Sequence, residues 1–199
     1  MHAQVWTYFP KESLPYVKRW FHKYSFDFVI TPHRTSKYGD FRPIGKNGIP
    51  QISINESLNP YQFLITFTHE LTHLIIWLRH KNSVKPHGPE WKNLFSEGLI
   101  YLLKKNIFPE DIKEDVYQYA LNPTASSASS HVLFSALRKY NTDENKLLLK
   151  EIPINKKFKV NNKVFIVKRK LRTRYLCKEV FSGKEYYISG LAEVEIVDK

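Results

Sequence analysis

The sequence His69-Glu70-Leu71-Thr72-His73 constrains this chain more than any other feature, because it has the HExxH pattern. On an α-helix, two histidines four residues apart project from the same face, as a zinc ion requires of two ligands from one helix. The glutamate between them lies close enough to take a proton from a water at the metal. The motif therefore predicts a helix, a metal centre with His69 and His73 as ligands, and Glu70 as the catalytic base.

Signals before and within the motif define the helix that carries it. Asn59 and Pro60 are typical of an N-cap and a first helical position, and the helix is predicted to run to about His80. At about 100° per residue its apolar side chains share one direction, and the two motif histidines face the opposite way. The apolar residues are Phe63, Leu64, Phe67, Leu71, Leu74, Ile75 and Leu78. The helix is therefore predicted to bury this stripe and to present both histidines to a second layer or a cleft.

A zinc site of this kind needs a third protein ligand, and helix geometry narrows the choice. His80 faces the same way as the motif histidines but lies ~10.5 Å beyond the second of them, too far for ligands of one ion. The chain is predicted to turn back after the helix, and His87 follows that turn just before a second predicted helix, residues 89–104. His87 is therefore the leading candidate, and Glu90 and Glu97 are the alternatives.

Two segments together resemble the SprT-like (Spartan-related) zinc metallopeptidase family. They are His69–His73 and Pro86-His87-Gly88-Pro89-Glu90-Trp91, and the second matches the family segment that supplies the third zinc histidine, here His87. The likeness covers most of residues 10–140. Its flanking segments are Lys37–Phe41, Ile52–Asn55 and Asn122–Pro123.

The resemblance implies an α+β, zincin-like metallopeptidase domain, in which the HExxH helix accompanies a small antiparallel sheet. It also implies one Zn²⁺ ion and DNA-stimulated proteolysis of proteins bound or crosslinked to DNA, a DNA–protein crosslink repair activity. Many members carry a C-terminal zinc ribbon. This chain has one cysteine, Cys177, and cannot build a ribbon from four cysteines.

Substrate contacts are predicted less sharply than the metal ligands. The run 49–54 alternates with period two, and its proline favours an edge position or a strand start, so the strand near Ile52 could hold an extended substrate. A donor that stabilises the oxyanion is also expected. The candidates are His33, Arg34 and Tyr101.

The C-terminal quarter differs in character, and we predict a domain boundary near residue 150. Residues 1–150 form the predicted metallopeptidase domain, and residues 151–199 a small, basic, β-barrel-like module of short strands and turns. The module contains 12 Lys and Arg against 6 Asp and Glu, in a chain with a net charge of +12. Its charge favours a nucleic-acid partner.

Within the basic module, residues 156–178 contain ten bases and no acid. The candidate DNA contacts are Lys168, Arg169, Lys170, Arg172 and Arg174. Three aromatic residues are interleaved with the bases, and they fit either base stacking or, as we prefer, the core of a small barrel. These aromatic residues are Phe158, Phe165 and Tyr175.

The leading hypothesis is a zinc metalloendopeptidase whose partners are protein substrates and DNA, single-stranded or containing a junction. The N-terminus lacks the pattern of a signal peptide, and no apolar run is long enough to span a membrane. We therefore expect a cytoplasmic protein, nucleoid-associated in a bacterium, with no membrane partner. The alternatives are a cytosolic zinc peptidase without DNA dependence and a non-enzymatic nucleic-acid-binding protein with structural zinc.

Overall fold

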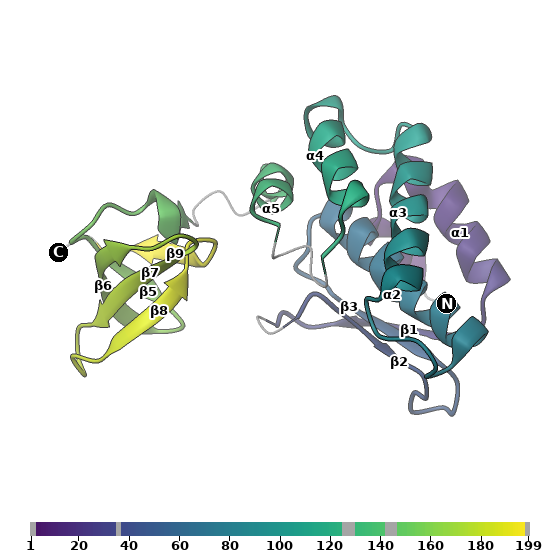
Figure 1. Ribbon diagram of the computed structural model, residues 1–199, viewed down its shortest axis with the longest axis horizontal. Coiled ribbons are helices and arrows are strands. Elements are labelled where there is room, and N and C mark those ends of the chain that lie inside the picture. Colours follow the sequence, from purple (N-terminus) through teal and green to yellow (C-terminus); the bar gives the residue numbers. More distant parts are fainter. Residues whose placement is uncertain (1–2, 35–36, 125–129, 142–146, 198–199) are drawn as a thin grey trace. The chain divides into compact units, whose positions relative to one another are not determined.

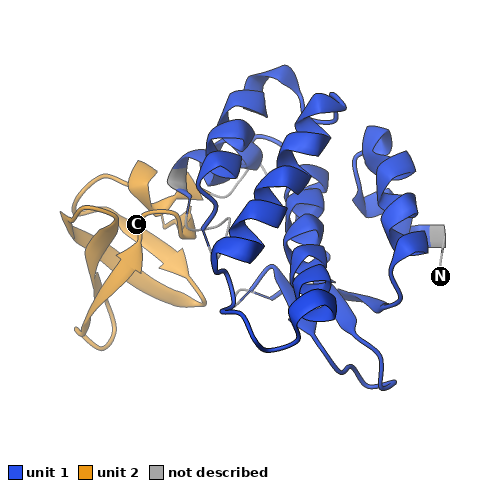
Figure 2. Cartoon of the chain, turned by 45° about the vertical axis from the view of Figure 1, so that its right-hand side comes forward, with its two compact units in different colours: residues 1–141 blue, residues 142–199 orange. Residues whose placement is uncertain are grey.

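The computed structural model describes residues 3–34, 37–124, 130–141 and 147–197. It divides into two compact units, residues 1–141 and 142–199 (Figure 2). This division lies before the predicted boundary at residue 150 because Leu148 and Leu149, both fully buried, belong to the second unit's sheet and core. No helix in the described part of the chain combines the length and apolar character that a membrane span needs.

The first unit packs helices against a small sheet (Figure 1). Short 3₁₀ helices at Ala3–Tyr8 and Lys11–Ser13 precede the α-helices. The α-helices are α1 (Leu14–Lys23), α2 (Pro60–His80), α3 (Pro89–Lys104), α4 (Glu110–Leu121) and α5 (His131–Arg138). The strands are β1 (Asp27–Thr31), β2 (Gly39–Arg42) and β3 (Gln51–Asn55). The predicted combination of helices with sheets is confirmed.

The first sheet corrects two predictions. Its order is β1-β3-β2, with β1 parallel to β3 and β2 antiparallel to β3, so the sheet is mixed and not antiparallel. The strand that contains Ile52 is central and is therefore not an edge strand that could hold a substrate. Of the two positions that its proline favours, the strand start is confirmed, because Pro50 directly precedes the strand and removes no donor from its ladders. The edge strand that lies beside α2 is β2.

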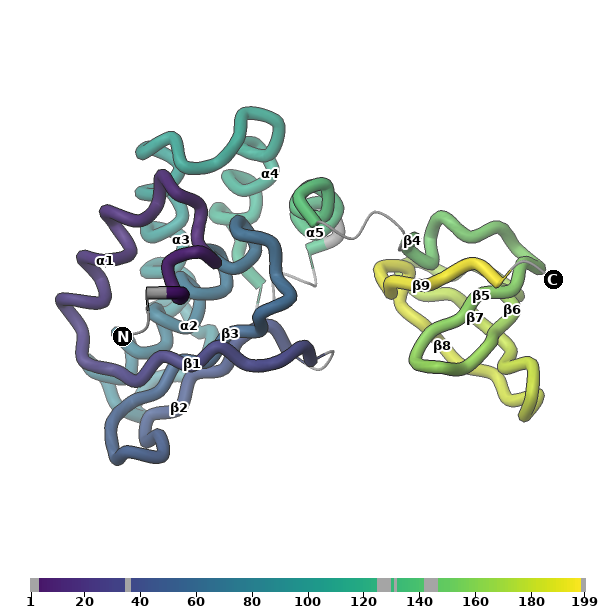
Figure 3. Tube along the Cα trace, turned by 180° about the vertical axis from the view of Figure 1, so that it is seen from behind, coloured from purple at the N-terminus to yellow at the C-terminus, as the bar shows by residue number. Residues whose placement is uncertain are grey.

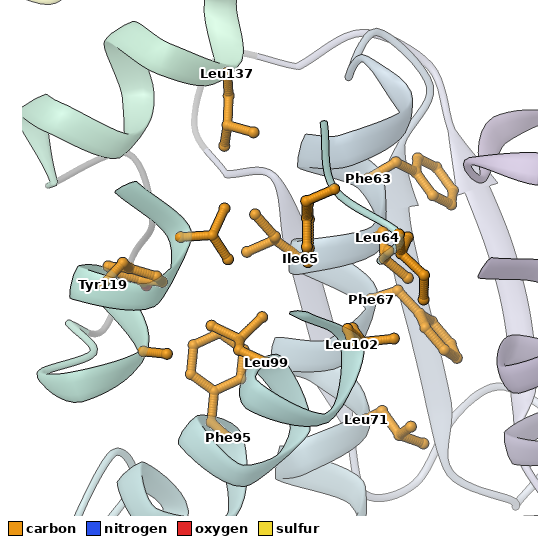
Figure 4. Close-up of a cluster of buried hydrophobic side chains, with 14 of the residues drawn as sticks. Phe63, Leu64, Ile65, Phe67, Leu71, Phe95, Leu99, Leu102, Tyr119 and Leu137 are labelled. Atoms are coloured by element: carbon orange, nitrogen blue, oxygen red, sulfur yellow. The ribbon is translucent and has the colours of Figure 1, made fainter. Parts of the chain in front are cut away.

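Helix α2 begins and ends where the sequence predicts. The Asn59 side chain accepts a hydrogen bond from the Gln62 backbone N–H at 3.0 Å and caps the helix. Figure 4 shows the apolar cluster in which side chains of α2 and α3 meet those of α4 and α5. Most of the predicted stripe is buried there, whereas Leu78, near the helix end, is 42% exposed.

The second unit is an antiparallel sheet of order β4-β9-β5-β6-β7-β8 (Figure 3). Its strands are β4 (Leu147–Leu148), β5 (Lys157–Val160), β6 (Lys163–Lys170), β7 (Arg174–Glu179), β8 (Glu185–Ser189) and β9 (Glu193–Ile196). Asn161 and Asn162 both have positive φ, 48° and 61°, as the two central residues of a type I′ hairpin turn require. The antiparallel arrangement is therefore shown, and closure into a barrel stays a prediction.

Candidate metal centre

Three histidines of the first unit converge on one point. His69 and His73 lie one turn apart on α2, and His87 lies in the loop before α3. The Nε2 atom of His73 is 3.2 Å from that of His69 and 3.0 Å from that of His87. The Nε2 atoms of His87 and His69 are 3.1 Å apart. The predicted third histidine thus joins the two histidines of the motif.

The loop between α2 and α3 reaches the site through unusual backbone conformations. Lys81, just after α2, has φ 51°, and His87 has φ 56°, a region that residues other than glycine seldom occupy. At Gly88, a Cβ would lie 2.9 Å from the Lys85 carbonyl oxygen, so glycine permits this tight approach. Strained backbone conformations of this kind are common at functional sites, and here one of them is at His87, a member of the histidine cluster.

Trp91 of α3 supports all three histidine rings. Its ring centroid lies 4.5 Å from that of His69, 5.2 Å from that of His73 and 4.7 Å from that of His87. Trp91 is 1% exposed and stacks on Phe95 at 4.8 Å, so it is itself held by the core. The side-chain packing of α3 therefore restricts the orientation of the three rings.

The electrostatics of the cluster favour neutral imidazoles. Burial, assisted by the neighbouring His73 and His87, lowers the pKa of His69 to about 2. Burial and His87 lower the pKa of His73 to about 4, and burial also lowers the pKa of His87. A neutral ring offers its nitrogen lone pair to a metal, whereas a protonated ring cannot.

The donor set fits a metal ion. Four-coordinate zinc binds histidine nitrogens at about 2.0–2.1 Å, which separates two of its ligand atoms by about 3.4 Å, close to the spacing observed. The three histidines could therefore hold one ion. The alternatives Glu90 and Glu97, and the more distant His80, do not join this cluster, which is the one group of potential ligands found in the described ranges.

Glu70 lies beside the three histidines, and strand β2 covers it. Glu70 is 7% exposed, and its carboxyl accepts a hydrogen bond from the Phe41 backbone. Burial raises the pKa of Glu70 to about 8, Asp40 contributes in the same direction, and nearby Lys37, Arg34 and the Phe41 bond oppose the rise.

Asp40 carries a local charge network at this edge. Its carboxylate accepts from Lys37 Nζ at 2.6 Å and from Arg42 Nε at 2.9 Å. Burial raises the pKa of Asp40, but these two cations outweigh burial and hold it below its ordinary value. The negative charge of Asp40, next to Glu70, is therefore balanced by two cations.

Gly39 permits the close contact between β2 and α2. A Cβ at this position would lie 2.5 Å from Glu70 Oε1 and 2.7 Å from Thr66 Cγ2, which are distances that real Cβ atoms do not show. Any side chain here would displace Glu70, the strand or both. Neither Gly39 nor Trp91 was assigned a role from sequence, because their contacts with the motif come from tertiary packing.

A cleft of about 610 Å³ opens over the histidines between β2, α2 and the loop before α3. It is lined by Gly39, Asp40 and Phe41 of β2, and by Trp77 and Lys81 at the end of α2. Two buried polar atoms in the described residues have no hydrogen-bond partner, Thr66 Oγ1 and Trp91 Nε1, and both residues line this cleft. Unsatisfied polar atoms are rare in folded proteins, so these two are unusual features of the cleft wall.

The three proposed oxyanion donors do not line the cleft. The His33 ring is hydrogen-bonded to Ser57 Oγ at 2.9 Å. Arg34 donates to the Lys37 carbonyl at 3.1 Å, and the Tyr101 ring packs edge-on against Tyr16.

The candidate DNA contacts of the second unit are all exposed and lie at one end of the β6–β7 hairpin. They are Lys168, Arg169, Lys170, Arg172 and Arg174. The interleaved aromatic residues Phe158, Phe165 and Tyr175 are 0%, 4% and 5% exposed and form the core, as preferred from sequence. They are therefore not available for base stacking.

No protein-family model, curated protein or solved structure matches the chain.

Proposed function

We propose that this protein is a zinc-dependent endopeptidase of SprT type that acts on proteins bound or crosslinked to DNA and is stimulated by DNA. The observation that carries the peptidase proposal is the convergence of three histidine Nε2 atoms within 3.2 Å, with Glu70 projecting from the same helix. Structural zinc sites usually have four protein ligands. Three ligands beside a cleft support catalysis.

His69, His73 and His87 would hold the zinc ion, which when bound supplies a Lewis acid with one open position for a water or a carbonyl oxygen. Glu70 takes the proton of the attacking water and returns it to the leaving amine. Gly39 and the Phe41 backbone keep its carboxyl in place for both transfers. Trp91 orients the three ligand rings.

An extended peptide is the substrate form that suits the cleft. Strand β2 lies at the edge of the first sheet, and Gly39, Asp40 and Phe41 line the cleft. An edge strand offers backbone donors and acceptors to a substrate strand. This role belongs to β2 and not, as the sequence suggested, to the strand that contains Ile52.

The DNA part of the proposal rests on the second unit. Its exposed bases Arg169, Arg172 and Arg174 and their lysine neighbours form a dense cationic region that suits phosphate groups. DNA held there would raise the local concentration of DNA-bound protein substrates.

The test is cleavage of a DNA-binding protein by the full zinc-loaded chain, with single-stranded DNA, with duplex DNA and without DNA. We expect cleavage with DNA and its loss in Glu70→Gln, a variant that retains zinc. Glu90→Gln is the matched control, because Glu90 is a nearby exposed glutamate outside the histidine cluster. Full cleavage by Glu70→Gln would refute the peptidase mechanism, and cleavage indifferent to DNA would refute the coupling alone.

A further inference from the structure

Strand pairing in the second unit aligns cations and one tyrosine on the outward face of three adjacent strands. Arg169 of β6 pairs with Leu176 of β7, which pairs with Tyr187 of β8. Arg174 and Lys178 lie two residues before and after Leu176, so they share its face. We call these five residues the β6–β8 outer face.

A β-bulge brings Arg169 to this face. Val167 pairs with the buried Cys177, whereas Arg169 pairs with Leu176, so Lys168 is the extra residue between the two pairs. Without the bulge, Arg169 would share the inward face of Val167, because alternate residues of a strand face the same way. The bulge therefore places a second arginine outward, beside Leu176.

Tyr187 is the aromatic side chain of this face, and it is 61% exposed. The neighbouring Tyr186 lies on the opposite face, where its ring packs edge-on against Phe165 at 5.6 Å. Opposed side chains on adjacent strands lie about 5 Å apart, so Arg169 and Tyr187 flank Leu176 within about 10 Å of each other. An exposed ring between cations is the arrangement that stacks a base while phosphates are neutralised.

The cations of this face are available to a ligand. In the described part of the chain, no ion pair engages Arg169, Arg174 or Lys178. One acid, Glu185, pairs with Lys178 across β7 and β8 at the margin of the face. The face as a whole therefore keeps a positive charge.

We propose that the β6–β8 outer face binds single-stranded DNA, with Tyr187 stacking on a base and Arg169, Arg174 and Lys178 contacting phosphates. A paired strand hides its base faces within the duplex, so stacking on Tyr187 requires an unpaired strand. The choice of DNA rests on the proposed function. Binding itself does not depend on the metal centre.

The experiment measures fluorescence anisotropy of a labelled single-stranded DNA 20-mer with the full chain across a salt series. Tyr187→Ala is expected to weaken binding by about 5- to 150-fold without changing the salt dependence, and Tyr187→Phe to restore it. The double variant Arg169→Gln/Arg174→Gln is expected to flatten the slope of log K against log salt by about 1.4, since each single-strand phosphate contact contributes about 0.7.

The matched control is Arg19→Gln/Arg79→Gln, which removes two exposed arginines of the first unit and is expected to bind as the unchanged chain does. Wild-type affinity of Tyr187→Ala, or an equal loss in the control, would overturn the proposal. So would binding of duplex DNA, or of RNA of the same sequence, at least as tight as that of the single strand. Because the readout is binding, and Glu70→Gln is expected to bind equally, failure of the peptidase proposal leaves this result intact.

Discussion

The two units hold the side chains of their proposed sites in opposite ways. In the first unit Glu70 is 7% exposed, and the three histidines lie against a tryptophan that is itself 1% exposed. In the second unit Arg169, Arg174 and Tyr187 lie on an outward sheet face and are exposed to solvent. The proposed chemistry at the first site would therefore depend on packing, and the proposed binding at the second on surface charge and one ring.

This difference determines what a substitution does. A single added methyl group can disturb the buried site, because protein interiors are close-packed and α2 touches the sheet on one side and α3 on another. On the exposed face, large changes of charge leave the core of Phe158, Phe165 and Cys177 untouched. A change in one unit is therefore expected to leave the other unit unaffected.

The largest effect is expected for His87→Ala. Removing one of three ligands should reduce bound zinc from about one ion per chain to nearly none, and cleavage by more than about 10³-fold, since the metal stabilises the transition state by several kcal/mol. Metal analysis and the cleavage assay measure this. His80→Ala and Glu97→Gln are the controls and should retain zinc. Zinc retained by His87→Ala but lost by Glu97→Gln would assign the ligand to the glutamate.

Cys177, in the second unit, is expected to be strongly protected from alkylation. The side chain is fully buried, and burial raises the pKa of its thiol to about 11. The native thiol should therefore be alkylated at least about 100-fold more slowly than the same thiol in urea, because only the thiolate reacts. The rate should rise as pH increases toward that pKa. Mass spectrometry after iodoacetamide treatment measures the rate, and zinc removal from the first unit should leave it unchanged.

Rapid labelling of native Cys177 would show that the second unit opens easily. Its exposed face would then not rest on a stable core, and the comparison with the packed first unit would be wrong. If labelling is slow, the alkylation rate of Cys177 can be used to check that variants of the β6–β8 outer face leave the second unit folded. Cys177→Ser provides the control without a reactive thiol.

The parts of this molecule that were predicted from sequence have local signals. Asn59 and Pro60 mark the start of α2, because each acts on backbone within a few residues. The histidine pair of the motif follows from helical periodicity alone. His87 was the leading candidate because the chain must turn back after the helix before it can supply a third ligand, although spacing alone left Glu90 and Glu97 open.

The parts that were missed depend on contacts distant in sequence. Gly39 and Glu70 meet through the packing of β2 on α2, and no spacing rule predicts that pair. The order β1-β3-β2 places Ile52 in the centre, although the proline before it fitted an edge position as well as a strand start. The bulge that brings Arg169 beside Leu176 depends on strand pairing, so Tyr187 had no visible role in the sequence.

Gly39→Ala tests how finely packing controls the first site. The added methyl group would lie 2.5 Å from Glu70 Oε1, so the carboxyl or the strand must shift. We expect kcat to fall by about 10²-fold with zinc retained, because a shift of about 1 Å at a reacting group has effects of this size. Gly98→Ala in α3 is the matched control, since its methyl group meets only Thr68 Cγ2 at 3.1 Å. Unchanged kcat in Gly39→Ala would show that Glu70 does not need this contact.

The smallest effect is expected for Asn59→Ala, which tests whether the two units are stabilised independently. Asn59 Oδ1 caps α2, and its Nδ2 donates to the Leu137 carbonyl at 2.9 Å and to Asn141 Oδ1 at 2.7 Å. Loss of the cap and of both donors should lower the free energy of unfolding of the first unit by about 2–3 kcal/mol. Urea unfolding followed by tryptophan fluorescence measures this change, because all four tryptophans, Trp6, Trp20, Trp77 and Trp91, lie in the first unit.

Asn59→Ser separates the two roles of that side chain. Its hydroxyl oxygen can still cap the helix, but the amide donors to Leu137 and Asn141 are lost, so its cost should be about half that of Asn59→Ala. Equal costs would assign the whole effect to the bonds with Leu137 and Asn141, and a change below about 0.5 kcal/mol in Asn59→Ala would show that the cap is dispensable. Alkylation of Cys177 should be unaffected in both variants. Faster alkylation would mean that the second unit draws stability from the first, and the units would then not be independent.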